Sequence, residues 1–173
     1  MAAKHVAAAL VATVLAGVPA AANDRAFFDS IQGTWSGPGQ IVAGKYKGTR
    51  FSCSLDGESL SGKGGMSLEG TCRVGIFSQA IKASVQRHGR GYRGSFLDGA
   101  KGKGLDVTAG NVHGDRITVG MEREELSGAM VARVKPDGRL AVTVSVRVGE
   151  ELVPVIGLDL SRRVDATATG SIR

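Results

Sequence analysis

The sequence predicts an all-β protein, a single antiparallel up-and-down β-barrel of 8–10 strands, with a β-sandwich as the alternative. Three observations support this prediction. Apolar and polar residues alternate along many short segments, Gly-rich or charged turns separate the segments, and no helical periodicity is sustained beyond one candidate turn at residues 24–30. Because short connections join consecutive strands, an up-and-down order is favoured, and closing the sheet buries its apolar face.

The first strand is expected at residues 31–42, where Ile31 and Trp35 share one face with Gly33 and other glycines. Pro38 lies inside this segment and has no backbone N–H to donate. The strand is therefore expected either at a sheet edge or bent at Pro38.

The later strands follow the same alternation up to residue 163. They are expected near residues 81–85, 92–96, 105–109, 117–121, 126–134, 140–148 and 152–163. In the last of these the apolar phase changes between Val155 and Ile156, which predicts a bulge near Pro154.

The only two cysteines lie on two alternating segments, residues 49–56 and 68–74. Pairing these segments as a hairpin places Cys53 directly opposite Cys72 on the apolar face, within the separation that a disulfide tolerates. Closing a loop of about 20 residues in this way would stabilise the fold by roughly 3 kcal/mol. We expect one structural disulfide between the two.

Length and charge fit one small exported domain. The chain has 173 residues and a formal net charge of +6 at pH 7. Residues 1–22 are expected to be a signal peptide, since a basic start and an apolar run precede the A-x-A pattern at residues 20–22. Residues 23–163 would form the barrel domain and residues 164–173 a flexible C-terminal tail.

The expected signal peptide also predicts where the protein is located. Val18 stands where the cysteine of a lipoprotein signal would be, so no lipid anchor is expected. No other apolar stretch is long enough to cross a bilayer. We therefore expect a periplasmic or secreted protein with no transmembrane segment after signal cleavage.

One short motif has a family resemblance. Gly33-Thr34-Trp35 on the first strand resembles the entry strand of calycin-like barrels, the group of lipocalins, fatty-acid-binding proteins and avidins. The resemblance implies a small barrel in which Trp35 packs at the base under a basic side chain from a late strand. Arg162 is the candidate for that cation–π contact. Ser36 departs from the aromatic that lipocalins usually have at this position.

Two segments resemble nucleotide-binding motifs, but their neighbouring residues do not support nucleotide binding. Residues 57–63 have P-loop spacing, but Gly64 replaces the required Ser or Thr. Residues 89–94 match G-x-G-x-x-G but lie between two expected strands. His88 and His113 are the only histidines after the leader, and neither has a catalytic or metal-binding setting. The sequence therefore predicts no enzyme, no catalytic residues, no metal site and no cofactor.

A basic run surrounds Tyr92 and is the candidate anion-binding region. In an exported protein its partner would be an anionic envelope component such as a glycolipid phosphate, and no nucleic acid is expected. Ordinary solvent-exposed loops that happen to be basic are the simpler explanation. The residues concerned are Arg87, His88, Arg90, Arg93, Lys101 and Lys103.

Three functions remain open. Many expected inward positions are small, which would leave room for a small apolar ligand or merely let a narrow barrel close; they are Gly33, Gly37, Gly70, Ala83, Gly94, Ala109, Gly128 and Ala132. The second function is a periplasmic protease inhibitor whose N-terminal arm, residues 23–30, presents Phe27 and Phe28. The third is an envelope factor that binds anionic glycolipid through the basic run.

Overall fold

The computed structural model describes residues 20–60, 62, 64–97 and 104–163, with side chains from Asp24 onward. The expected signal peptide, the tail at residues 164–173, and Lys101 and Lys103 lie outside the described residues, apart from the backbone of residues 20–22. Within the described part, no helix combines the length and the hydropathy that crossing a bilayer requires.

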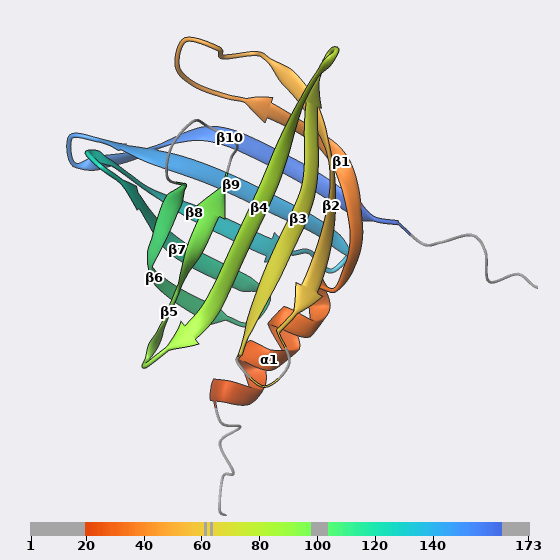
Figure 1. Ribbon diagram of the computed structural model, residues 1–173, viewed down its shortest axis with the longest axis vertical. Helices are drawn as coiled ribbons and strands as arrows, with labels where there is room; N and C mark the ends of the chain where they lie inside the picture. The colour runs from red at the N-terminus through yellow and green to blue at the C-terminus, as the bar shows by residue number, and fades with distance from the viewer. Residues whose placement is uncertain (1–19, 61, 63, 98–103, 164–173) are drawn as a thin grey trace, which may run out of the picture.

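The chain forms a closed antiparallel barrel of ten strands, which confirms the predicted fold class (Figure 1). Each strand pairs with its sequence neighbours, and β1 pairs with β10 to close the ring. The elements are α1 (Ala20–Ile31), β1 (Gly33–Ile41), β2 (Arg50–Ser59), β3 (Gly65–Val74), β4 (Phe77–His88), β5 (Gly91–Leu97), β6 (Leu105–His113), β7 (Arg116–Arg123), β8 (Leu126–Val134), β9 (Arg139–Val148) and β10 (Glu151–Arg162).

A helix lies across one end of the barrel. The N-terminal segment forms α1, which is longer than the single helical turn expected and ends at Ile31, where the sequence pattern predicted the first strand to begin. Its apolar residues Phe27, Phe28 and Ile31 are buried against the barrel base. In Figure 1, α1 lies at the bottom, and the β1–β2 and β3–β4 connections project at the opposite end. We call these the closed end and the open end.

The irregularities of the strands agree in part with the sequence. β1 pairs on both sides, so Pro38 does not mark an edge; the β1–β10 pairs lie on either side of Gly37 and Pro38, where the missing N–H interrupts the ladder. The predicted bulge is present in β10 between Pro154 and Ile156. A further irregularity in β6, between Val107 and Ala109, was not predicted.

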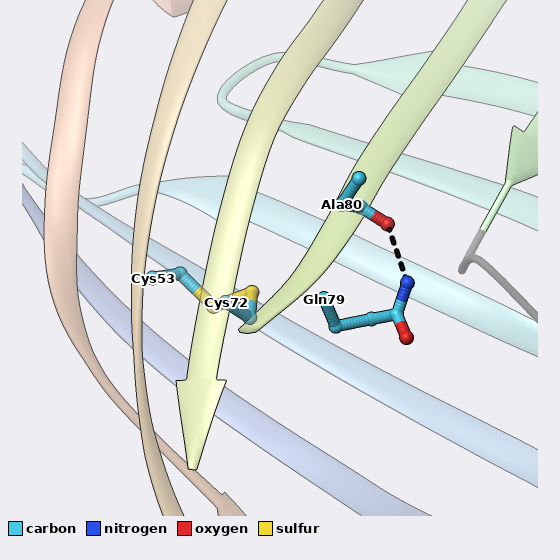
Figure 2. Close-up of a disulfide and its surroundings, with 4 residues drawn as sticks. All are labelled: Cys53, Cys72, Gln79 and Ala80. Atoms are coloured by element: carbon cyan, nitrogen blue, oxygen red, sulfur yellow. Dashed lines mark hydrogen bonds between the residues drawn. A yellow bond between two sulfur atoms is a disulfide. The ribbon is translucent and has the colours of Figure 1, made fainter. Parts of the chain in front are cut away.

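The β2–β3 hairpin has the predicted register and a disulfide. Cys53 lies directly opposite Cys72, with a Cα–Cα distance of 4.0 Å, and the two sulfurs are bonded. Figure 2 shows the bridge spanning the two neighbouring strands. The bond lies in the half of the hairpin nearer the open end, close to the start of β2 and the end of β3.

Candidate ligand cavity

An apolar cavity of about 390 Å³ occupies the barrel interior. All ten strands and α1 contribute to its wall, from Ile41 on β1 and Phe51 on β2 to Leu158 on β10. Among the described residues that line it, only Ser84, Ser127 and Ser145 have polar side chains, and none is ionisable. The cavity therefore offers an apolar volume with few hydrogen-bonding groups.

The inward glycines do not all create this volume. A Cβ atom at Gly70 would lie 2.1 Å from the carbonyl oxygen of Ser54, and one at Gly94 would lie 1.8 Å from that of Ser84. These glycines let neighbouring strands approach closely and so let the sheet coil into a barrel. Of the small residues predicted to leave room, Ala83, Gly128 and Ala132 do line the cavity.

Trp35 and Arg162 join α1 to the barrel at the closed end. The Trp35 side chain is fully buried, and its Nε1 donates a hydrogen bond to the carbonyl oxygen of Ile31 at 2.8 Å. The Arg162 guanidinium lies 4.4 Å from the Trp35 ring centroid and donates to the carbonyl oxygens of Ser30, at 2.6 Å, and Gln32. These bonds satisfy carbonyl groups at and just beyond the C-terminus of α1, where a cation also complements the helix dipole.

Gly33 makes this contact possible. Its φ of 109° lies in the region that favours glycine, and a Cβ there would come 2.8 Å from Nη1 of Arg162. The glycine of the Gly33-Thr34-Trp35 motif thus turns the chain from α1 into β1 beneath the arginine. The residues on which the family resemblance rests hold the closed end together and do not line the cavity mouth.

A second polar cluster seals the same end. The Tyr92 hydroxyl donates to the buried Asp24 carboxylate at 2.7 Å, and Arg87 donates to the Tyr92 hydroxyl at 3.0 Å and pairs with Asp24. The Phe28 ring packs edge-on against Tyr92, with ring centroids 5.3 Å apart. Burial, reinforced by the hydrogen bond to the Asp24 carboxylate, raises the pKa of Tyr92 above its ordinary range, so the hydroxyl stays a donor.

The structure describes four of the six candidate anion-binding residues. Arg87 is engaged with Asp24 and Tyr92. His88, Arg90 and Arg93 are exposed on or beside the β4–β5 turn at the closed end, and Lys101 and Lys103 lie outside the described residues. An anion site at the three exposed residues stays a prediction.

The proposed inhibitory arm is not a free segment, which corrects that expectation. Phe27 and Phe28 are only 2% and 1% exposed, because both pack into the barrel base from α1. Presenting either ring to a protease would require α1 to leave the barrel.

The exposed apolar side chains around the open end were not predicted from the sequence. Ile76 in the β3–β4 turn is 93% exposed, and Phe77 at the start of β4 is 75% exposed. Two large apolar residues in a turn were the available signal, since turns are ordinarily polar. Elsewhere in the described part of the chain, no three His, Cys, Asp or Glu side chains gather closely enough to hold a metal ion.

Comparison with known proteins identifies the fold but no family. No family model and no curated protein matches the sequence. Among solved structures, the crystal structure of Rv2717c from M. tuberculosis is similar, with a TM-score of 0.51 and 15% sequence identity over 82% of this chain and 98% of that chain. At this identity the likeness shows the fold alone. The chain is a small β-barrel with one disulfide, and its calycin-like resemblance stays a prediction.

Proposed function

We propose that this chain is an exported, non-enzymatic carrier that holds a small apolar ligand, of the size of a lipid acyl chain, inside the barrel. The single observation behind the proposal is the apolar cavity of about 390 Å³. Its volume lies within the range of about 300–1,000 Å³ that small-molecule sites occupy. Removing each ligand methylene from water would contribute about 0.8 kcal/mol.

The wall chemistry limits the ligand class. A charged group buried in this cavity would have no ionisable partner, and burying an unpaired charge is strongly unfavourable. The ligand body is therefore apolar, and any charged headgroup stays at the mouth.

The packing at the two ends of the barrel indicates where a ligand would enter the cavity. At the closed end, Trp35, Phe28 and Leu160 fill the barrel and are at most 1% exposed. Entry there would require α1 to detach, so the ligand enters and leaves through the open end. The disulfide supports the exported location, because such bonds persist in oxidising compartments.

Native mass spectrometry of the purified protein, with displacement of an environment-sensitive fluorescent fatty acid, tests the proposal. We expect one ligand per chain and a saturable fluorescence change. Val144→Phe places a ring in the cavity and should weaken probe binding by at least about tenfold.

The matched control is Thr143→Phe, which adds a ring on the exposed outer face of the same strand. It should bind the probe as the unmodified protein does. Equal binding by both variants would place the probe outside the barrel and overturn the proposal, as would the absence of any saturable binding by the unmodified protein.

A further inference from the structure

The large apolar side chains that reach solvent are confined to one end of the barrel. Across the described residues, every exposed large apolar side chain lies at the open end: Val42, Tyr46, Val74, Ile76, Phe77, Leu97, Leu126, Val148 and Leu152. Single exposed apolar residues are ordinary on a protein surface, but a set gathered around one cavity mouth is not. This clustering indicates a surface that binds something apolar.

One side of this rim is basic as well as apolar. It consists of residues 41–52, from the end of β1 to the start of β2, and residues 73–81 around the β3–β4 turn, and we call it the basic rim. The two segments are adjacent because β2 pairs with β3. The basic rim carries exposed Lys45, Lys47, Arg50 and Arg73 and has no acidic residue, and it contains five of the exposed apolar side chains.

The cations of the basic rim are available for an outside partner. Lys45 lies 5.5 Å from the Tyr46 ring centroid, on an exposed tip. Within the described part of the chain, Lys47, Arg50 and Arg73 pair with no acidic side chain. At the closed end, Arg87 and Arg139 are engaged in ion pairs, whereas Arg90 and Arg93 are exposed.

The other side of the mouth has the opposite charge. Around the β7–β8 turn lie Glu124 and Glu125, and the β9–β10 turn carries Glu150 and Glu151. This acidic side also has exposed apolar residues, Leu126, Val148 and Leu152. Among the described residues of the mouth, the glutamates around these two turns outnumber Arg123 and Arg147, whereas the charged residues of the basic rim are all cations.

We propose that the basic rim docks on an anionic lipid bilayer, placing the cavity mouth against the membrane. The inference rests on the proposed carrier function for its purpose, though not for its geometry. Apolar side chains flanked by lysines and arginines are suited to the headgroup–acyl boundary of a bilayer, where the rings insert and the cations meet lipid phosphates. Docking lets an apolar ligand pass between bilayer and cavity without crossing water, because the apolar rim is continuous with the apolar wall through Ile41 and Phe51.

Co-sedimentation with vesicles tests the docking directly. The full processed chain should bind vesicles that contain phosphatidylglycerol and should bind pure phosphatidylcholine vesicles at least about tenfold more weakly. Raising the salt concentration should release it, because the attraction is screened. Lys45→Glu with Lys47→Glu should lower binding to the anionic vesicles by about tenfold or more. Ile76→Ser with Phe77→Ser should do the same through loss of apolar insertion.

The matched control removes apolar side chains from the acidic side of the same mouth. Val148→Ser with Leu152→Ser should leave vesicle binding unchanged. Circular dichroism and thermal unfolding would verify that each variant folds, which is expected because all the altered side chains are exposed. Equal losses in the two serine pairs, or equal binding to both vesicle types, would overturn the proposal. A dimer that is lost in the Ile76/Phe77 pair, without vesicle binding by the unmodified protein, would also overturn it and assign the rim to self-association.

The two proposals fail in different measurements. Val144→Phe should weaken probe binding in solution by at least about tenfold and leave vesicle binding intact. Ile76→Ser with Phe77→Ser should keep the solution affinity for the probe and slow its transfer from anionic vesicles by at least about tenfold. Vesicle binding without any probe binding would refute the carrier function alone, and probe binding without vesicle binding would refute the docking alone.

Discussion

The two ends of the barrel belong to the same strands yet differ in nearly every physical respect. At the closed end, α1 and Trp35 fill the barrel, Arg162 binds the helix carbonyls, and Arg87 and Tyr92 engage the buried Asp24. At the open end, the described residues include no such plug, and the large apolar side chains reach solvent. The closed end therefore concentrates the interactions that hold the fold, and the open end presents the surface that is free to bind.

The difference shows how a small barrel can be stable and still be hollow. A fully buried large apolar side chain stabilises a fold by about 1.5–3 kcal/mol, whereas an exposed one contributes little. Side chains that line the cavity or lie exposed on the rim contribute less of this stabilisation, and the fully buried side chains of the closed end contribute most of it. The single disulfide lies nearer the open end, where it ties β2 to β3 in the half of the barrel that lacks the packed aromatic plug.

The largest expected effect is on the free energy of unfolding. It appears when the truncation of an aromatic side chain at the closed end is compared with a truncation at the open end. Trp35→Ala should lower the free energy of unfolding by about 3–5 kcal/mol, because it leaves a cavity and removes the donor to Ile31. Phe77→Ala, at a 75% exposed position, should change it by less than about 0.5 kcal/mol. Urea unfolding followed by circular dichroism measures both.

Trp35→Phe keeps the comparison measurable where the alanine variant does not fold. It retains a ring but loses the Nε1–H donor, so it should be destabilised by less than the alanine variant. Comparable losses at Trp35 and Phe77 would contradict the assignment of stability to the closed end.

Removing the disulfide should have an intermediate effect. Cys53→Ala with Cys72→Ala should lower the free energy of unfolding by about 3 kcal/mol, because the bond closes a loop of about 20 residues in the unfolded chain. Hydrogen exchange should speed up most in β2 and β3 near the open end, with α1 and the start of β1 little changed. If exchange instead sped up mainly in α1, the result would contradict the conclusion that the disulfide stabilises the open end.

Most of the fold could be predicted from the sequence, because the alternation of apolar and polar residues and the residue types of turns are local signals. The pairing of Cys53 with Cys72 and the bulge after Pro154 were both predictable from phase alone. The length of α1 was not, because its stability comes from docking Phe27 and Phe28 into a barrel base that the linear pattern does not show.

The candidate site was less predictable. Small inward residues suggested interior space, but Gly70 and Gly94 serve close strand approach, a distinction that only the three-dimensional contacts make. The basic run looked like one cluster, yet Arg87 turns to a buried carboxylate far away in sequence. The rim is gathered from turns that are distant along the chain, so its apolar character emerges only when the barrel closes.

The smallest expected effect is a loss of closed-end stability at alkaline pH. Because burial raises the pKa of Tyr92 in the fold, the folded state holds this proton more tightly than the unfolded state, whose tyrosine ionises near pH 10. Tyr92→Phe loses the hydrogen bond to Asp24 and should be less stable by about 1 kcal/mol at neutral pH. This difference should persist up to about pH 10 and shrink above it, as the unfolded state of the unmodified protein releases its proton. Urea midpoints of the two proteins from neutral to alkaline pH measure the effect, with other titrating groups cancelling in the comparison. A constant or growing difference above about pH 10 would show that the Tyr92 hydroxyl is not the buried, protonated donor of the closed end.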